Sequence, residues 1–266
     1  MMMEKIGIIG RGFVGQAIAN ALEMSATVVS MDHAKGYNAT YQDLIDCSGI
    51  FVCVPTPQDD DGTCDTRILA GILNDLQSRG YTGVIISKCT APPDWYEAWN
   101  ITHPNLIHAP EFLTAANAAA DYLNGEFAFI GGRVPAYVRE AHRIILLSQP
   151  RLQKIQHCTI AEAAMVKYAI NTFLATKVVF MNELKDLCSK TSVDYNQVAY
   201  MVKQDRRVGS SHMQVPGPDG NYGFGGPCLP KDANSFLKYA EQKGTVMNVL
   251  DAAVKKNTLL RLTEPK

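Results

Sequence analysis

The sequence predicts an α/β protein, in which a Rossmann-like doubly wound parallel sheet precedes an all-helical domain with one long central helix. Two observations predict this fold class. Early in the chain, short β-rich runs alternate with helical runs, which is the order found in parallel sheets. Between residues 159 and 189 there is neither Pro nor Gly, as is typical of a single long helix. We therefore predict a first domain over residues 1–157 and a second over residues 158–266.

Hydrophobic pattern and turn residues assign the elements in order. The predicted strands lie at residues 5–9, 27–31, 50–54, 84–87, 106–108 and 127–130. Helices are predicted at residues 13–24, 65–79, 136–147, 159–189, 196–203, 232–243 and 246–260, with a loop rich in Gly and Pro over residues 209–230. The helix at 159–189 is apolar on most sides, so we expect other elements or subunits to bury it.

Composition and charge exclude several classes of protein. A net charge of -1 provides no basic excess for nucleic acid, and the seven cysteines show no Cys-x-x-Cys spacing of a zinc site. No apolar run is predicted to span a membrane, and the first ten residues lack the pattern of a signal region. We therefore predict a cytoplasmic protein that binds no metal, no nucleic acid and no membrane.

A glycine motif lies between the first predicted strand and helix. Its G-x-G-x-x-G spacing allows a tight turn and lets a pyrophosphate approach backbone N–H groups at a helix N-terminus. Asp32 ends the second predicted strand, where a carboxylate binds ribose hydroxyls and repels a 2′-phosphate. The cofactor predicted is therefore NAD rather than NADP. Candidate cofactor-binding residues are Gly10, Gly12, Phe13, Val14, Gly15, Asp32, Lys35 on the adenosine side, Thr56 and Thr90.

Polar residues in otherwise apolar surroundings mark candidate chemistry. Lys167 and Asn171 lie four residues apart on one face of the long helix, where both could donate to a developing oxyanion. Spacing alone equally allows a lysine that snorkels and an amide that packs between helices. Thr56, Thr90 and Glu111 each follow a predicted strand, where doubly wound sheets bind ligands.

Cys228 lies in a glycine-rich loop just before a predicted helix, beside Lys231. Helix N-termini and nearby lysines favour reactive thiolates, and the glycines allow a substrate to come close. The alternative is a small buried cysteine, and we interpret the other six cysteines in that way.

Taken together, these segments resemble the UDP-glucose/GDP-mannose dehydrogenase family. The matching segments are Gly-Arg-Gly-Phe-Val-Gly at 10–15, Val-Pro-Thr-Pro at 54–57, Pro-Glu-Phe-Leu at 110–113, the long helix with Lys167 and Asn171, Asp-Arg-Arg-Val-Gly at 205–209 and Gly-Phe-Gly-Gly-Pro-Cys-Leu-Pro-Lys-Asp at 223–232. They fall in the family's order, and the resemblance covers essentially the whole chain.

The resemblance implies oxidation of a UDP-glucose-type nucleotide sugar to the acid by two hydride transfers to NAD, through a thiohemiacetal and a thioester on Cys228. It implies that Lys167 and Asn171 stabilise the oxyanion and that Asp232 orients water, with Thr90 and Glu111 close by. The remaining implied substrate-binding residues are Phe112, Leu113, Arg207 from a partner subunit, Tyr222 and Gly225. It also implies a homodimer built on the long helix.

Departures from the family pattern leave alternatives open. Family members usually continue into a further domain that holds much of the nucleotide, and Thr114-Ala115 stands where Arg-Glu often follows Pro-Glu-Phe-Leu. A separate chain could supply that domain. The alternatives are a two-electron β-hydroxyacid-type dehydrogenase, which needs no cysteine, and a non-catalytic NAD-binding remnant.

Overall fold

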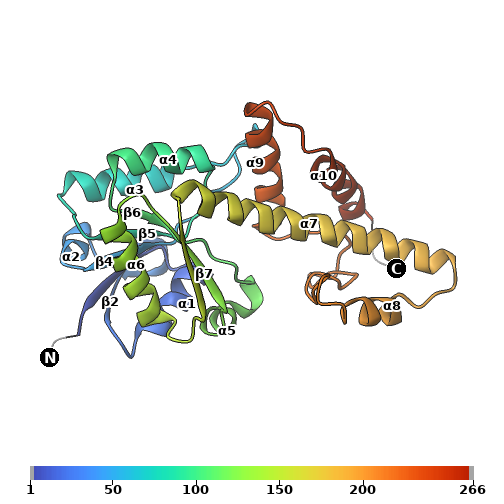
Figure 1. Cartoon of the computed structure of the whole chain (residues 1–266), viewed down its shortest axis with the longest axis horizontal. Coiled ribbons are helices and arrows are strands. Elements are labelled where there is room, and N and C mark those ends of the chain that lie inside the picture. The colour runs from blue at the N-terminus through green and yellow to red at the C-terminus, as the bar shows by residue number, and fades with distance from the viewer. Residues whose placement is uncertain (1–2, 264–266) are drawn as a thin grey trace. The chain divides into compact units, whose positions relative to one another are not determined.

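The computed structural model describes residues 3–263, which pack as two compact units (Figure 1). The first unit extends to Lys167 but excludes residues 58–63. The second unit contains residues 58–63 and the chain from Tyr168 onward. This division falls inside the long helix rather than before it, because Ile160 and Ala164 in its first turns pack into a core of the first unit.

An eight-stranded sheet forms the centre of the first unit, in the order β3-β2-β1-β4-β5-β6-β7-β8. The strands are β1 (Lys5–Ile9), β2 (Thr27–Asp32), β3 (Tyr37–Asn38), β4 (Gly49–Val52), β5 (Val84–Ser87), β6 (Leu106–His108), β7 (Phe127–Gly131) and β8 (Lys154–Cys158). Strands β2, β1, β4, β5 and β6 run parallel, with β1 at the point where the strand order reverses. The predicted doubly wound α/β fold class is confirmed.

Two features of the sheet differ from the predicted pattern. Strand β7 is antiparallel to β6, and β3 is antiparallel to β2, so the sheet is mixed rather than wholly parallel. Strands β3 and β8 are not among the predicted strands. Strand β8 pairs with β7 at the sheet edge, and its residues Lys-Ile-Gln-His-Cys are largely exposed. An edge strand of this kind lacks the apolar run that marks a buried strand.

Helices cover both faces of this sheet (Figure 1). One face packs against α1 (Phe13–Leu22), α5 (Ala118–Leu123) and α6 (Pro135–Ser148). The other packs against α2 (Tyr41–Ile45), α3 (Arg67–Ser78) and α4 (Pro93–Thr102). Ile8 lies in the first core and Ile9 in the second, because successive strand residues point to opposite faces. Short 3-10 helices lie at His33–Lys35 and Ala115–Asn117.

The second unit is helical, as predicted. It contains α7 (Ile160–Lys190) from Tyr168 onward, α8 (Tyr195–Val202), α9 (Leu229–Gln242) and α10 (Asn248–Arg261). Figure 1 shows α9 and α10 on one side of α7 and α8 on the other. The Tyr168 ring stacks on Phe236 of α9, with ring centroids 5.2 Å apart. Helix α9 begins earlier than predicted, because Pro230 is accommodated in a first helical turn, where its missing N–H leaves no bond unmade.

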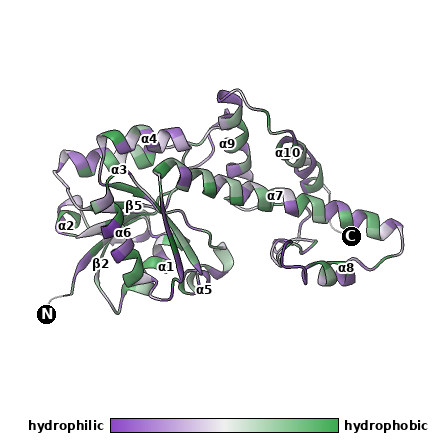
Figure 2. Cartoon of the chain, viewed as in Figure 1, coloured by the Kyte–Doolittle hydropathy of each residue, from purple (hydrophilic) through white to green (hydrophobic). Residues whose placement is uncertain are grey.

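Apolar residues, in green, alternate with polar residues, in purple, along α7 (Figure 2). An 18-residue window within it has a mean hydropathy of 1.2, so by length and composition alone the helix could cross a membrane. Lys167 and Lys177 interrupt the helix, so no uninterrupted apolar run reaches this length, and α7 meets the criterion through its mean hydropathy alone. The criterion is weak, because core helices of soluble proteins also meet it, and 44% of this window is buried within the structure.

Candidate active site

The glycine loop joins β1 to α1, and its three glycines differ in whether a side chain would fit. Gly10 adopts φ +89°, a left-handed conformation that disfavours side chains. A Cβ on Gly15 would lie 1.9 Å from the carbonyl oxygen of Gly10, so only glycine fits there. A Cβ on Gly12 would meet nothing within 4 Å, so this position, the N-cap of α1, faces open space. The loop therefore leaves room for a ligand at a helix N-terminus.

Asp32 closes the same site from the end of β2. Its Oδ2 accepts a hydrogen bond from the backbone N–H of Arg11 at 2.7 Å, which ties the strand end to the glycine loop. The Lys35 ammonium donates to the Arg11 carbonyl at 2.9 Å. Arg11 itself is buried, donates to Ser30 and lies 4.3 Å from the Tyr37 ring centroid. Carboxylate, glycines and helix N-terminus are thus assembled as an NAD site requires.

The other predicted cofactor residues surround this loop. Phe13 is partly exposed, and Val14 packs against the core beneath α1. Thr56 follows β4 and is buried, whereas Thr90 follows β5 and is half-buried. The Cys64 thiol lies 3.3 Å from the Thr90 carbonyl and 4.0 Å from that of Thr56. These contacts link the two threonine segments at neighbouring strand ends through Cys64, which was interpreted only as a small buried cysteine.

Glu111 follows β6, and both oxygens of its carboxylate have partners. Its Oε2 lies 3.2 Å from Nζ of Lys88, whose side chain is only 2% exposed. Its Oε1 accepts the backbone N–H of Phe112 at 3.0 Å. Lys167 of α7 donates to the Glu111 carbonyl oxygen and lies over the Phe112 ring. The structure therefore brings Glu111, Lys167 and Lys88 together within the first unit.

Lys88 is not among the predicted site residues. It directly follows the buried strand β5 and precedes Cys89 and Thr90, so its place at a strand end was the available signal. A buried lysine needs a charge partner, and Glu111 supplies one. The pair fixes the carboxylate at the edge where parallel strands bind ligands.

Aromatic rings and a neutral histidine complete this edge of the first unit. Phe112 contacts the Phe127 ring at 5.5 Å between centroids, and Leu113 packs against the sheet core. His108 is fully buried and stacks on Tyr96, and burial lowers the pKa of its imidazole to about 3. Its ring is therefore uncharged at neutral pH, beside a site that already holds two lysines.

In the second unit, Asn171 and Asp232 form the central contact. Asn171 Nδ2 donates to Asp232 Oδ2 at 2.5 Å, and Nζ of Lys231 lies 2.5 Å from Oδ1. The Asp232 side chain is 1% exposed, so both of its oxygens are held inside the unit. Lys167 and Asn171 thus have different acceptors, Glu111 in the first unit and Asp232 in the second.

Cys228 is the N-cap residue of α9 and is half-buried. The backbone N–H of Asp232 donates to the Cys228 carbonyl at 2.8 Å, so one helical turn links the thiol to the buried carboxylate. Helix N-termini are positions where proteins place nucleophilic thiolates. We refer to residues 223–228 as the cysteine loop. By contrast, burial raises the pKa of Cys47 to about 11, which agrees with its interpretation as a core residue.

The remaining predicted substrate residues lie around the same unit. The Arg207 side chain is 89% exposed and contacts Asp205 at 2.6 Å, which raises the pKa of its guanidinium. Tyr222 packs beside Met181 and Tyr195. A Cβ on Gly225 would lie 2.9 Å from the Arg261 guanidinium, so glycine leaves space for that contact.

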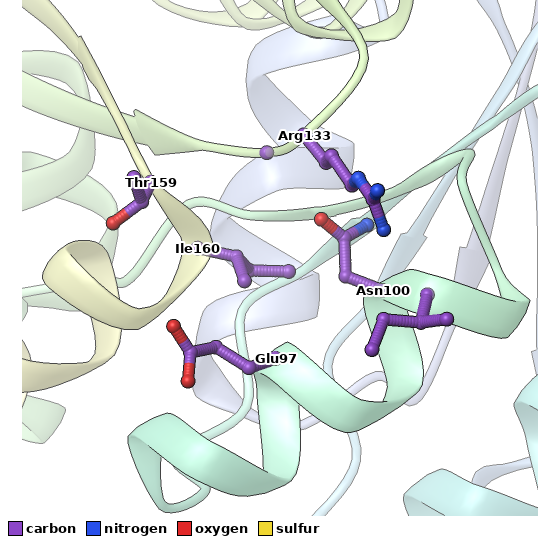
Figure 3. A pocket seen from close by; sticks show the side chains of 7 residues that line it. Glu97, Asn100, Arg133, Thr159 and Ile160 are labelled. Atoms are coloured by element: carbon purple, nitrogen blue, oxygen red, sulfur yellow. The ribbon is translucent and has the colours of Figure 1, made fainter.

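A pocket of about 340 Å³ in the first unit is lined by none of the predicted site residues (Figure 3). It is bounded by Glu97, Asn100, Ile101, Gly132, Arg133, Thr159 and Ile160. Between residues 3 and 263, no group of three or more His, Cys, Asp or Glu side chains is arranged to hold a metal ion.

Comparison with known proteins places both units in one family. Residues 23–145 match the NAD binding domain of the UDP-glucose/GDP-mannose dehydrogenase family, and residues 161–259 match its central domain. The UDP-glucose 6-dehydrogenase YwqF of Bacillus subtilis is 31% identical over 218 residues, which cover 78% of this chain and 48% of that protein. The UDP-glucose 6-dehydrogenase AglM of Haloferax volcanii is 25% identical over 304 residues, covering 95% of this chain and 69% of that protein. The chain spans about half the length of most of the curated relatives that it matches.

Solved structures share the fold. A UDP-glucose dehydrogenase from Pyrobaculum islandicum superposes with a TM-score of 0.80 at 24% identity, covering 97% of this chain and 68% of that one. A 3-hydroxyisobutyrate dehydrogenase from Mycobacterium tuberculosis gives a TM-score of 0.75 at 17% identity, covering 96% of this chain and 92% of that one. With both domains matched, the chain belongs to the UDP-glucose/GDP-mannose dehydrogenase family of NAD-dependent oxidoreductases.

Proposed function

We propose that the protein oxidises the C6 alcohol of UDP-glucose to the carboxylate of UDP-glucuronate, using two NAD. The observation that carries this proposal is Cys228 at the N-cap of α9, one turn from the buried Asp232. The relatives named UDP-glucose 6-dehydrogenase support UDP-glucose as the substrate.

The residues present fit NAD. Open space at Gly12, the close approach at Gly15 and the Asp32 carboxylate leave one place for a pyrophosphate and a ribose. When bound there, NAD supplies a hydride acceptor. Asp32 accepts ribose hydroxyls and disfavours a 2′-phosphate, and the N-terminus of α1 faces the pyrophosphate.

Cys228 makes the second oxidation feasible by covalent catalysis. The alcohol first loses a hydride and a proton, which gives an aldehyde. The Cys228 thiolate adds to the aldehyde carbon, which gives a thiohemiacetal alkoxide, and this alkoxide loses a second hydride. The product is a thioester. Water attacks its carbonyl carbon, the C–S bond breaks, and the acid and the thiol are released.

Neighbouring groups supply charge and orientation for these steps. Lys167 and Asn171 donate hydrogen bonds to the oxygen on the reacting carbon, which carries negative charge as the thiolate or water adds. Asp232 orients water for hydrolysis, and its fixed hydrogen bonds with Asn171 and Lys231 keep it in one rotamer. Glu111 and Thr90 help to hold the sugar and the water, and Lys88 holds the Glu111 carboxylate.

Counting products tests this proposal. Purified protein with UDP-glucose should form two NADH per UDP-glucuronate. Cys228→Ser should abolish acid formation while NAD binding stays unchanged, and Cys158→Ser, at another half-buried cysteine, should behave as wild type. One NADH per sugar would instead favour the two-electron dehydrogenase. NAD binding without any NADH formation would favour the non-catalytic remnant.

We further propose that the chain forms a homodimer through α7. Phe173, Phe180 and Leu187 recur every seven residues along one face of this helix and are 66%, 60% and 58% exposed. Exposed apolar side chains that gather on one face mark interaction surfaces. Phe180→Arg should give a monomer in light scattering, whereas Leu259→Arg, at an exposed residue of α10, should not. A wild-type chain that stays monomeric at every concentration would refute the dimer, and with it the role of Arg207 at a partner's site.

A further inference from the structure

Asn257 of α10 contacts the cysteine loop through both ends of its side-chain amide. Its Oδ1 accepts the backbone N–H of Phe224 at 2.6 Å, and its Nδ2 donates to the Phe224 carbonyl at 3.0 Å. Asn257 is 8% exposed and Phe224 is 4% exposed, so these bonds are made away from bulk water. The amide thus satisfies both backbone polar groups of Phe224, as a neighbouring strand would do in a sheet.

Asn182 of α7 holds the residue just before. Its Oδ1 accepts the backbone N–H of Gly223 at 3.1 Å, while its Nδ2 donates to the Val178 carbonyl at 2.8 Å. Gly223 has φ +71°, and a Cβ there would lie 2.3 Å from Oδ1 of Asn257. The absence of a side chain at Gly223 therefore allows the Asn257 amide to approach the backbone of the loop.

The other end of the loop is fixed by α9, through the bond from the Asp232 N–H to the Cys228 carbonyl. Between Phe224 and Cys228 stand only Gly225, Gly226 and Pro227, of which Gly226 has φ +76°. Two glycines in so short a span would allow many conformations if the first end were released.

We infer that Asn257 and Asn182 are positioning residues, which hold the cysteine loop so that Cys228 stands where the proposed thiohemiacetal forms. This inference deepens the proposed function and rests on it for its catalytic consequence. Its structural part, that the two amides order residues 223–228, is independent of any activity.

Hydrogen exchange tests the structural part. Asn257→Leu removes both bonds to Phe224, and amides in peptides covering 223–228 should exchange at least tenfold faster, with the sheet of the first unit unchanged. Asn248→Leu makes the same substitution at an exposed position of the same helix and should leave the loop unchanged. Unaltered exchange in Asn257→Leu would overturn the inference. Should that variant fail to fold, Asn182→Ala, which frees the Gly223 N–H and also removes the bond to the Val178 carbonyl, provides the same comparison.

A double-mutant cycle tests the catalytic part. Asn257→Leu alone should lower kcat for acid formation at least tenfold with the KM for NAD unchanged. The same substitution added to Cys228→Ala should not slow the first NADH in a single turnover, because the residue acts through the thiol. An equal loss in both backgrounds would indicate a general structural role and overturn the inference. If the wild-type chain forms no NADH from UDP-glucose, the proposed function fails, and the exchange experiment alone decides on the loop.

Discussion

Replacing Lys88 by methionine removes the charge partner of Glu111 and nearly preserves the volume of the side chain. The Lys88 side chain is 2% exposed and that of Glu111 is 13% exposed, so the 3.2 Å contact between them is screened little by solvent. Lys88→Met should therefore leave a nearly buried carboxylate without its cation.

The magnitude follows from burial. Removing one member of a buried pair typically costs about 3–5 kcal/mol, whereas an exposed pair contributes about 0–1 kcal/mol. Glu111 keeps the hydrogen bond from the Phe112 N–H at 3.0 Å, so the lower end of this range, about 3 kcal/mol, is expected. Adding Glu111→Gln should recover most of the loss, because the uncompensated charge is then gone.

Urea unfolding followed by tryptophan fluorescence measures this cost in the first unit, which contains Lys88 and Glu111. The chain has two tryptophans, Trp95 and Trp99, and both lie in α4 of the first unit. The control is Arg79→Met, since Arg79 and Asp75 form an ion pair in the same unit with side chains 45% and 47% exposed. Equal losses for Lys88→Met and Arg79→Met, or no recovery in the double variant, would refute the reasoning.

Further predictions concern the cofactor loop and a buried imidazole. Gly15→Ala should destabilise the first unit by about 1–3 kcal/mol, because its Cβ would meet the Gly10 carbonyl. Gly12→Ala should fold normally and weaken NAD binding. Thermal melts with NAD titration measure both effects, and a larger loss of stability in Gly12→Ala than in Gly15→Ala would contradict the prediction. Asp32→Ala should raise the Kd for NAD about tenfold or more by calorimetry, since a carboxylate's hydrogen bonds are worth about 1.5–3 kcal/mol, and an unchanged Kd would count against the ribose contact. Burial lowers the pKa of His108 from 6.5 to about 3, so the unfolded chain binds its proton first as pH falls. The free energy of unfolding should drop by about 1.4 kcal/mol per pH unit between pH 6.5 and about pH 3. In His108→Phe, the contribution of this histidine to the pH dependence should be absent.

The elements that sequence predicted well are those whose signal is local. The glycine loop, the buried strands β1, β4 and β5, and the Gly- and Pro-free run of α7 each carry their own pattern. The edge strand β8 does not, because its pairing with β7 depends on the tertiary fold. The orientation of β7 was missed for the same reason, since a strand's own residues do not say whether its neighbour is parallel.

The residues of the candidate site also differ in whether a local sequence pattern marks them. Cys228 and Glu111 stand in distinctive local sequence, whereas Lys88 and Asn257 acquire their meaning only from a partner distant in the chain. Lys88 meets a carboxylate 23 residues away, and Asn257 meets a backbone 33 residues away. Neither spacing is periodic, so only the folded chain reveals these contacts.

The different acceptors of Lys167 and Asn171 bear on the oxyanion role that was predicted for both. Lys167 donates to a backbone carbonyl and Asn171 to the Asp232 carboxylate. An ammonium group has three N–H bonds and an amide nitrogen has two, so each contact uses one donor of its group. Each bond therefore fixes the direction of its donor before substrate arrives, that of Lys167 within the first unit and that of Asn171 within the second. Such preorganisation is what makes hydrogen bonds effective in catalysis, because little reorganisation is left for the reaction itself.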